Sequence, residues 1–168
     1  MRRHPADPDS ISGTILYAPN SRLSAPVNLP VLPPLLPDVP LILIVEDNKV
    51  NQRLVRDIIR GQGWNSIETE TVGDARQILR MLRVRGEMPA AILLDIRLPD
   101  ESGLVLAREL KADRHWKSVP IIAVTALAMN NDEGRILDAG CDAYIAKPIS
   151  VSELTETVQK YVSSSTLA

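Results

Sequence analysis

Short apolar runs alternate with longer amphipathic segments along the chain from Leu41 onward. The runs are rich in β-branched and aliphatic side chains and are bounded by polar or turn residues: Leu41–Val45, Ala91–Leu94, Pro120–Val124 and Ala143–Ala146, with a further short strand expected at Asn65–Thr69. Runs that are apolar throughout, rather than alternating with polar residues, are typical of strands buried on both faces of a parallel sheet. The pattern therefore predicts five buried strands.

The segments between these runs carry apolar residues at helical spacing. In the second of them the apolar residues follow the i, i+3, i+4, i+7 pattern of one helix face, at Ala75, Ile78, Leu79 and Leu82. A capping box opens the last helix at Ser150, and Gly140 is suited to end the one before it. The spacing predicts helices over about residues 48–61, 75–82, 102–111, 131–139 and from 150 onward.

Five consecutive strand–helix units predict an α/β fold of the (βα)5 type. Connections from strand to helix to parallel strand are right-handed, so they force a doubly wound parallel sheet with helices on both faces. We expect this domain to occupy residues 41–162 and to be followed by a flexible tail at residues 163–168.

The first 40 residues differ from the rest and hold 9 of the 13 prolines. Proline lacks the backbone N–H for a sheet ladder and restricts the residue before it, so we expect residues 1–40 to form a disordered arm, partly polyproline II. Two interpretations remain open. The arm is either a docking segment for a partner's groove or a linker or dispensable extension.

The overall composition is that of an ordinary soluble chain, with 45% hydrophobic and 24% charged residues. A formal net charge of −2 gives no electrostatic reason to expect nucleic-acid binding. The single cysteine, Cys141, excludes an intrachain disulfide framework. No apolar stretch approaches the length of a membrane span, and no signal-peptide core follows Met1, so we expect a cytoplasmic protein without membrane contact.

Reactive side chains stand where four of the apolar runs end. Glu46 and Asp47 follow the first run, and Asp95, Thr125 and Lys147 follow the others. In open α/β sheets, ligands bind outside the carboxyl ends of the strands, so these groups are expected to meet at one edge. Three carboxylates that crowd together repel one another, and a hard divalent cation with oxygen ligands removes that repulsion. The set therefore predicts a Mg²⁺ site.

The same groups suit phosphoryl transfer. A metal-held carboxylate can attack a phosphoryl group and form an aspartyl phosphate, and Asp95, a lone acid directly at a strand end, is the candidate. The ammonium of Lys147 and the hydroxyl of Thr125 would contact the phosphoryl oxygens. We also expect a cis peptide between Lys147 and Pro148 that turns the ammonium into the site.

The chain from Leu41 to Val162 resembles the receiver domain of two-component response regulators. The resemblance rests on motifs that occur in the family's order: Glu46-Asp47-Asn48, Asp95-Ile96-Arg97-Leu98-Pro99, Gly103, Thr125-Ala126, Ala139-Gly140 and Lys147-Pro148. It implies the strand order 2-1-3-4-5 of flavodoxin-like folds. Within the family, the chain is most similar to single-domain receivers of the cell-division-control type and also resembles receivers fused to hybrid histidine kinases.

The resemblance implies a role for each matching residue. Asp95 would be the phosphoacceptor, and Mg²⁺ would be held by the carboxylates of Asp47 and Asp95, by Glu46 through water, and by the backbone carbonyl of Arg97. Thr125 would be the switch hydroxyl and Tyr144 the switch aromatic residue. Arg97 and Leu127 would flank the attacking water, and neither can serve as its base, so we expect slow self-dephosphorylation.

The function implied is a phosphoryl-accepting switch of a phosphorelay. The phosphoryl donor would be a sensor histidine kinase or a histidine phosphotransfer protein, and the output would be contact with a protein target through the fourth helix, fifth strand and fifth helix. Only six residues follow Val162, so we expect a stand-alone receiver that catalyses nothing beyond its own phosphorylation and dephosphorylation.

Two alternatives remain open. One is a receiver that acts as a scaffold without being phosphorylated. The other is a phosphatase of the haloacid-dehalogenase type, which also uses an aspartyl nucleophile on a doubly wound sheet. Those enzymes carry a second acid two residues after the nucleophile, where this chain has Arg97.

Overall fold

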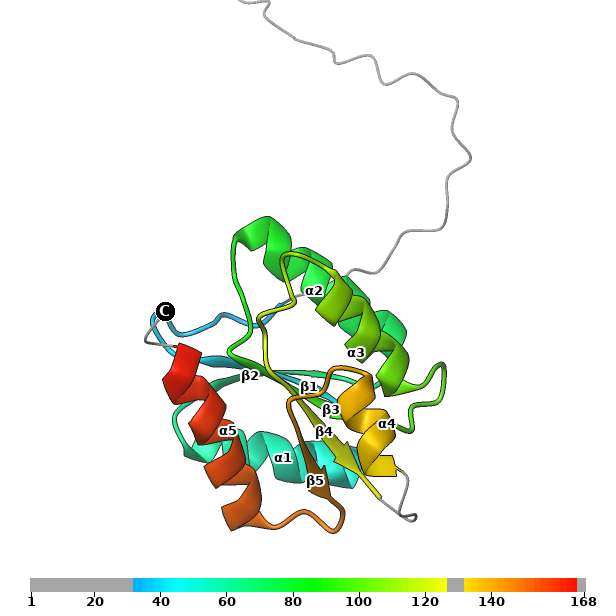
Figure 1. Cartoon of the computed structure of the whole chain (residues 1–168). Helices are drawn as coiled ribbons and strands as arrows, with labels where there is room; N and C mark the ends of the chain where they lie inside the picture. Colours follow the sequence, from blue (N-terminus) through cyan, green and yellow to red (C-terminus); the bar gives the residue numbers. More distant parts are fainter. Residues whose placement is uncertain (1–31, 127–131, 166–168) are drawn as a thin grey trace, which may run out of the picture.

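A five-stranded parallel sheet forms the centre of the structure, a computed structural model that describes residues 32–126 and 132–165 (Figure 1). The strands are β1 (Leu41–Val45), β2 (Asn65–Thr69), β3 (Ala91–Asp95), β4 (Ile121–Thr125) and β5 (Ala143–Ala146). Their order in the sheet is β2-β1-β3-β4-β5, and every neighbouring pair is parallel. The predicted fold class and strand order are confirmed.

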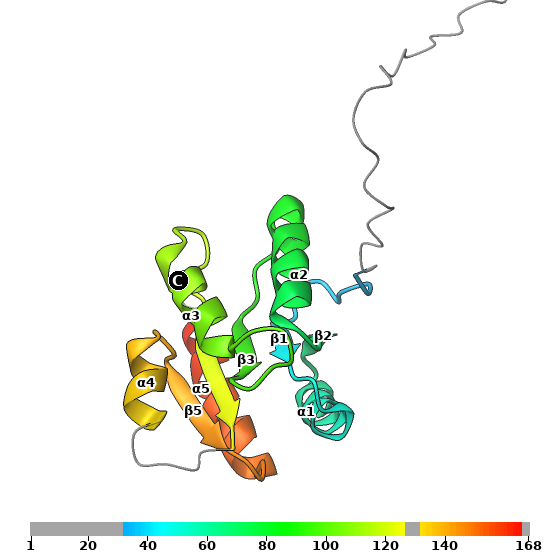
Figure 2. The ribbon, with the colours of Figure 1, turned by 90° about the vertical axis from the view of Figure 1, so that its right-hand side faces the viewer.

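Helices cover both faces of this sheet (Figures 1 and 2). They are α1 (Lys49–Gly61), α2 (Val72–Arg85), α3 (Gly103–Ala112), α4 (Asp132–Asp138) and α5 (Val151–Ser165). One core cluster joins the sheet to α2, α3 and α4, and a second joins it to α1 and α5. None of the described helices is long and apolar enough to cross a bilayer.

Strand β1 shows why the apolar runs are uninterrupted. Ile42 and Ile44 belong to the cluster under α1 and α5, whereas Leu43 and Val45 belong to the cluster under α2, α3 and α4. Successive side chains in a strand point to opposite faces. Because both faces are covered, all five residues of β1 are buried.

The ends of the domain differ from the sequence-based expectation. Helix α5 continues to Ser165, beyond the expected end of the domain at Val162. Residues 32–40, expected to be part of a disordered arm, pack on the domain, and we call them the strap. The rest of the expected arm, residues 1–31, lies outside the described residues.

The strap is held by apolar packing and by one asparagine. Leu32 is 4% exposed within the core cluster of α2 and α3, and Leu35 packs against the same cluster. The side chain of Asn65, at the start of β2, accepts a hydrogen bond from the Leu36 N–H at 3.1 Å and donates to the carbonyls of Leu36 and Val39 at 3.0 and 3.1 Å. Proline prevents ladder pairing here, but it does not prevent the leucines between the prolines from being buried.

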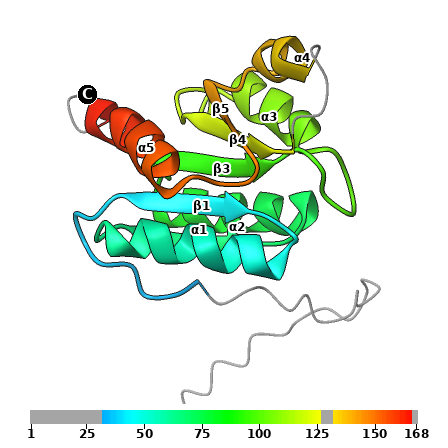
Figure 3. The same cartoon turned by 90° about the horizontal axis from the view of Figure 1, so that it is seen from below.

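The carboxyl ends of all five strands lie at one edge of the sheet, because the strands are parallel. The loops that follow β1 and β3 leave on the same side (Figure 3). The loop between β3 and α3, residues 96–102, and the loop between β5 and α5 complete this edge. The predicted site residues that follow β1, β3 and β5 or end β4 are therefore delivered to the same region of the molecule.

Candidate functional site

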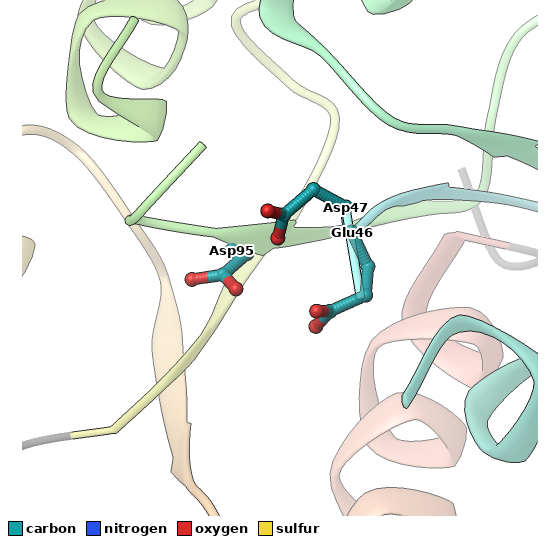
Figure 4. A group of neighbouring side chains, drawn as sticks. All are labelled: Glu46, Asp47 and Asp95. Carbon is teal, nitrogen blue, oxygen red and sulfur yellow. The ribbon is translucent and has the colours of Figure 1, made fainter. Parts of the chain in front are cut away.

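Three carboxylates converge at the carboxyl ends of β1 and β3. Glu46, Asp47 and Asp95 each offer an oxygen atom, and these atoms all lie within 4.8 Å of one another (Figure 4). The register of the neighbouring strands pairs Val45 with Leu94, so the residues that follow this pair come to lie together. Glu46 and Asp95 are buried, at 3% and 5% exposure, whereas Asp47 is exposed to solvent.

Lys147 bridges the two buried carboxylates. Its Nζ lies 2.8 Å from Oε2 of Glu46 and 2.6 Å from Oδ2 of Asp95. The residue follows β5, its backbone N–H donates to the Thr125 carbonyl at 2.8 Å, and its peptide bond with Pro148 is cis. Burial on its own lowers the pKa of Lys147, but the hydrogen bonds and charges of Asp95 and Glu46 raise that pKa above its ordinary value. The ammonium therefore stays charged at neutral pH.

Helix α1 fixes the position of Glu46. The carboxylate accepts hydrogen bonds from the Asn48 N–H at 3.1 Å and from the Asn51 amide at 3.4 Å. The Asn48 side chain also caps α1, so it accepts the N–H groups of the first helical turn. Gln52, which the sequence did not single out, donates to the carbonyls of Glu46 and Thr69 at 3.0 and 3.1 Å and ties the ends of β1 and β2 together.

Asp95 is fixed by the turn that follows it. Its Oδ1 accepts the Arg97 N–H at 2.9 Å, and the Gly103 N–H donates to the Ile96 carbonyl at 3.0 Å. A Cβ atom on Gly103 would meet the Asp95 carbonyl oxygen at 2.1 Å, so only glycine allows α3 to begin this close to the end of β3. The Arg97 side chain is exposed, and its backbone lies beside the Asp95 carboxylate.

Thr125 and Tyr144 lie on the side of the site toward α4. Thr125 is 4% exposed at the end of β4 and lines a cavity of about 390 Å³ together with Ser102 and Ile136. Tyr144 is half-buried on β5, opposite Ala123 in the register. The negative charge of Glu133 on α4 raises the pKa of Tyr144 above its ordinary value. Leu127 lies outside the described residues.

The structure brings Glu46, Asp47, Asp95 and Lys147 into direct proximity, while Tyr144 stands apart from this cluster. Three close carboxylates with one exposed edge form an oxygen-rich site suited to a hard divalent cation. A buried carboxylate beside a lysine ammonium is suited to nucleophilic attack on an anionic group. The ammonium reduces the repulsion between the carboxylate and the approaching anionic group.

Comparison with known proteins gives consistent matches. Residues 42–159 match the model of the response regulator receiver domain family. The chain is 44% identical over 121 residues to the polar-differentiation response regulator DivK of Brucella ovis, an alignment that covers 72% of this chain and 94% of that protein. The protein of the same name from Brucella anthropi is 45% identical with the same coverage.

Solved receiver domains are similar in structure as well. One is the receiver domain of a sensor histidine kinase from Pseudomonas aeruginosa, with magnesium coordinated in its active site cleft. It is 33% identical, with a TM-score of 0.62 and coverage of 74% of this chain and 98% of that one. Another is the receiver domain of a signal transduction histidine kinase from Syntrophus aciditrophicus, with 28% identity, a TM-score of 0.66, and coverage of 75% and 92%.

Proposed function

Because the chain belongs to the family of response regulator receiver domains, we propose that it is a phosphoryl-accepting switch in which Asp95 is the phosphoacceptor. The observation that carries this proposal is the convergence of Asp95, two further carboxylates and the Lys147 ammonium at one edge of the sheet. The donor would be a sensor histidine kinase or a histidine phosphotransfer protein of a phosphorelay.

The acidic cluster fits Mg²⁺. Asp47 and Asp95 would bind it directly, the Arg97 carbonyl would supply a further oxygen, and Glu46 would act through water. The spacing of the carboxylate oxygens and their hard donor chemistry support this assignment. When bound, the cation offsets the charge of the phosphoryl oxygens.

The chain's own residues perform the transfer. A carboxylate oxygen of Asp95 forms a bond to phosphorus while the bond between phosphorus and the donor's imidazole nitrogen breaks, and the electron pair of that bond returns to the imidazole. Lys147 moves its ion pair from the Asp95 carboxylate to a phosphoryl oxygen. The Thr125 hydroxyl donates a hydrogen bond to another phosphoryl oxygen. Each contact strengthens as the anionic group arrives, as transition-state stabilisation requires.

The output would be a change of surface. Phosphorylation biases a two-state equilibrium in which Thr125 and Tyr144 change position, and a protein target binds the face formed by α4, β5 and α5. Tyr144 and Glu133 lie on this face, which supports the assignment of the readout to it. The alignment covers 94% of the Brucella ovis regulator, which supports a receiver of the same type.

A direct test is incubation with Mg²⁺ and acetyl phosphate, followed by intact mass spectrometry. The wild type is expected to gain one phosphoryl group, and Asp95→Ala is expected to gain none. Asp57→Ala is a matched control, because Asp57 is exposed and pairs with the neighbouring Arg56. An unchanged wild-type mass would favour the scaffold alternative and overturn the proposal. A gain in Asp95→Ala would place the acceptor elsewhere. Continuous release of phosphate from a generic ester would favour the phosphatase alternative.

A further inference from the structure

The loop between β3 and α3, residues 96–102, is tied at its tip to the start of another helix. The carboxylate of Asp100 accepts hydrogen bonds from the backbone N–H groups of Val72 at 3.1 Å and Gly73 at 2.9 Å. These are the first two residues of α2. A helix leaves the N–H groups of its first turn without partners inside the helix, and here two of them bind a side chain that comes from the loop beside the acidic cluster.

The base of the same loop is closed by its own backbone. The Gly103 N–H donates to the Ile96 carbonyl at 3.0 Å, and Arg97 and Ser102 form an antiparallel bridge. With its base closed and its tip tied to α2, the loop has little freedom to move as a unit. The backbone of Arg97 lies within this closed part, and its N–H donates to the Asp95 carboxylate at 2.9 Å.

We propose that Asp100 is a positioning residue of the site. Its hydrogen bonds to the first turn of α2 hold the loop in place, and the loop in turn fixes the position of the Arg97 backbone relative to the Asp95 carboxylate. Asp100 would thereby position the Arg97 carbonyl oxygen and the Asp95 carboxylate oxygens that are offered to Mg²⁺. The inference rests on the proposed function, because positioning matters only if the cluster binds the cation. Groups that orient metal ligands without touching the metal commonly change metal affinity by about 10–100-fold when removed.

The electrostatics of Asp100 agree with this role. Burial raises the pKa of the carboxyl, but hydrogen bonds from the backbone N–H groups of Gly73, Val72, Asp100 and Glu101 lower that pKa below its ordinary value. A negative charge at a helix N-terminus is also favoured by the helix dipole. The carboxylate is therefore ionised at neutral pH and can accept both α2 N–H groups there.

A second, weaker tie runs parallel to the first. Arg76 on α2 pairs with Glu101 of the loop at 2.7 Å and with Glu109 on α3 at 2.6 Å. All three side chains are partly exposed, at 31%, 38% and 47%, and ion pairs of this kind contribute little on their own. The Asp100 carboxylate is exposed as well, but its two partners are backbone N–H groups whose positions are fixed by α2.

The test compares Asp100→Asn with Asp74→Asn. Asparagine at position 100 removes the charge and keeps one acceptor oxygen, so it can accept only one of the two α2 N–H groups, while its amide NH2 faces the other. Asp74 is an exposed residue of the first turn of α2, so its replacement changes the same charge near the same helix end without touching the loop. Mg²⁺ affinity is measured by isothermal titration calorimetry, and exchange of the amide hydrogens of residues 96–102 is measured by NMR.

Asp100→Asn is expected to weaken Mg²⁺ binding by about tenfold and to speed amide exchange in the loop, whereas Asp74→Asn leaves both near wild type. Phosphorylation of Asp100→Asn by acetyl phosphate should need a higher Mg²⁺ concentration than phosphorylation of the wild type. At saturating Mg²⁺ the rates of the two proteins should differ less. A loss of global stability alone would not give this split. Equal Mg²⁺ affinity and loop exchange in the two variants would overturn the proposal.

Asp100→Ser covers the case in which Asp100→Asn does not fold. Serine removes the charge and offers only a shorter hydroxyl acceptor to the α2 N–H groups, so its Mg²⁺ affinity is also expected below that of wild type. Wild-type affinity in Asp100→Ser would also overturn the proposal. Failure of the wild type itself to bind Mg²⁺ or accept a phosphoryl group would instead overturn the proposed function, so the two failures are distinguishable.

Discussion

The Nζ of Lys147 lies 2.6 Å from the Oδ2 of Asp95, although the two residues are 52 positions apart in the sequence. The same ammonium lies 2.8 Å from Glu46, so one cation holds together two buried carboxylates that would otherwise repel each other. Lys147 therefore offsets part of the carboxylate repulsion that Mg²⁺ is also proposed to offset.

Replacement of Lys147 by methionine should destabilise the metal-free protein. Loss of the cation leaves Glu46 and Asp95 buried without a counter-charge, and we expect a cost of about 2 kcal/mol, below the value for a fully buried pair because the side chain is 17% exposed. Mg²⁺ should recover part of the loss. Urea unfolding with and without Mg²⁺ measures both effects. Lys49→Met is the control, since its partner Glu70 is exposed, and its cost should stay below about 0.5 kcal/mol.

The Lys147 ion pairs also predict a pH dependence. The pKa of Lys147 in the folded protein is raised above its ordinary value of 10.5, so the folded state holds the proton more tightly than the unfolded state does. The stabilisation is fully present below pH 10.5 and is lost as the pH rises through the higher folded pKa. In Mg²⁺-free buffer, the difference in unfolding free energy between wild type and Lys147→Met should shrink at high pH. A difference that grows with pH would contradict the assigned charge.

Gly103 should tolerate no side chain. A Cβ atom would lie 2.1 Å from the Asp95 carbonyl oxygen, so Gly103→Ala must displace the start of α3 from the end of β3. We expect a loss of about 2 kcal/mol in unfolding free energy and slower phosphorylation of Asp95. Gly134→Ala should change the unfolding free energy in the opposite direction. It lies in α4 with nothing within 4 Å of the added atom, and it should stabilise the protein by about 0.5–1 kcal/mol.

The strap should contribute to stability through its buried leucine. Leu32→Ala removes a side chain that is 4% exposed, and we expect a loss of about 2 kcal/mol, at the low end for buried leucines because the strap can relax. Leu36→Ala changes a residue of the same segment that is 64% exposed, and its effect should stay within about 0.5 kcal/mol. Equal unfolding curves for the two variants would mean that the strap does not pack in solution.

Arg97 should make the phosphorylated form long-lived. Its exposed side chain cannot act as a base for attacking water, so we expect decay over minutes or longer. Arg97→Glu places a carboxylate near that water and should speed decay by up to about tenfold, less than an optimally positioned base would. Arg53→Glu makes the same change of charge on the exposed surface of α1 and should leave the decay unchanged. Intact mass after removal of the phosphodonor follows the decay, and loss within seconds in the wild type would contradict the prediction.

The grouping of site residues at the carboxyl ends of the strands could be predicted from the sequence, because reactive residues directly follow the apolar runs. An acid or a lysine directly after an apolar run is placed at the carboxyl edge of a parallel sheet, and in the structure Lys147 lies within hydrogen-bonding distance of Glu46 and Asp95. The order of the strands came from the family resemblance, since periodicity predicts strands but not their neighbours.

Other features carry no readable signal in the sequence. The partners of Asp100 are backbone N–H groups 27 and 28 positions away, and every residue except proline offers such a group. Gln52 likewise binds two carbonyls. The strap was expected to be disordered because its proline content argues against strands and helices, yet the burial of Leu32 needs neither. Contacts between a side chain and backbone groups far away in the sequence become visible only once the chain is folded.

The strap fixes where the preceding chain meets the domain. Asn65 anchors it at β2, which is one edge of the sheet, while β5 is the opposite edge. A fluorescent protein or an affinity tag joined directly ahead of Leu32 would thus be attached across the width of the sheet from β5. Fusions built at this position should leave the α4–β5–α5 face, the proposed target-binding face, uncovered, which makes the amino end the better site for attaching a reporter to this protein.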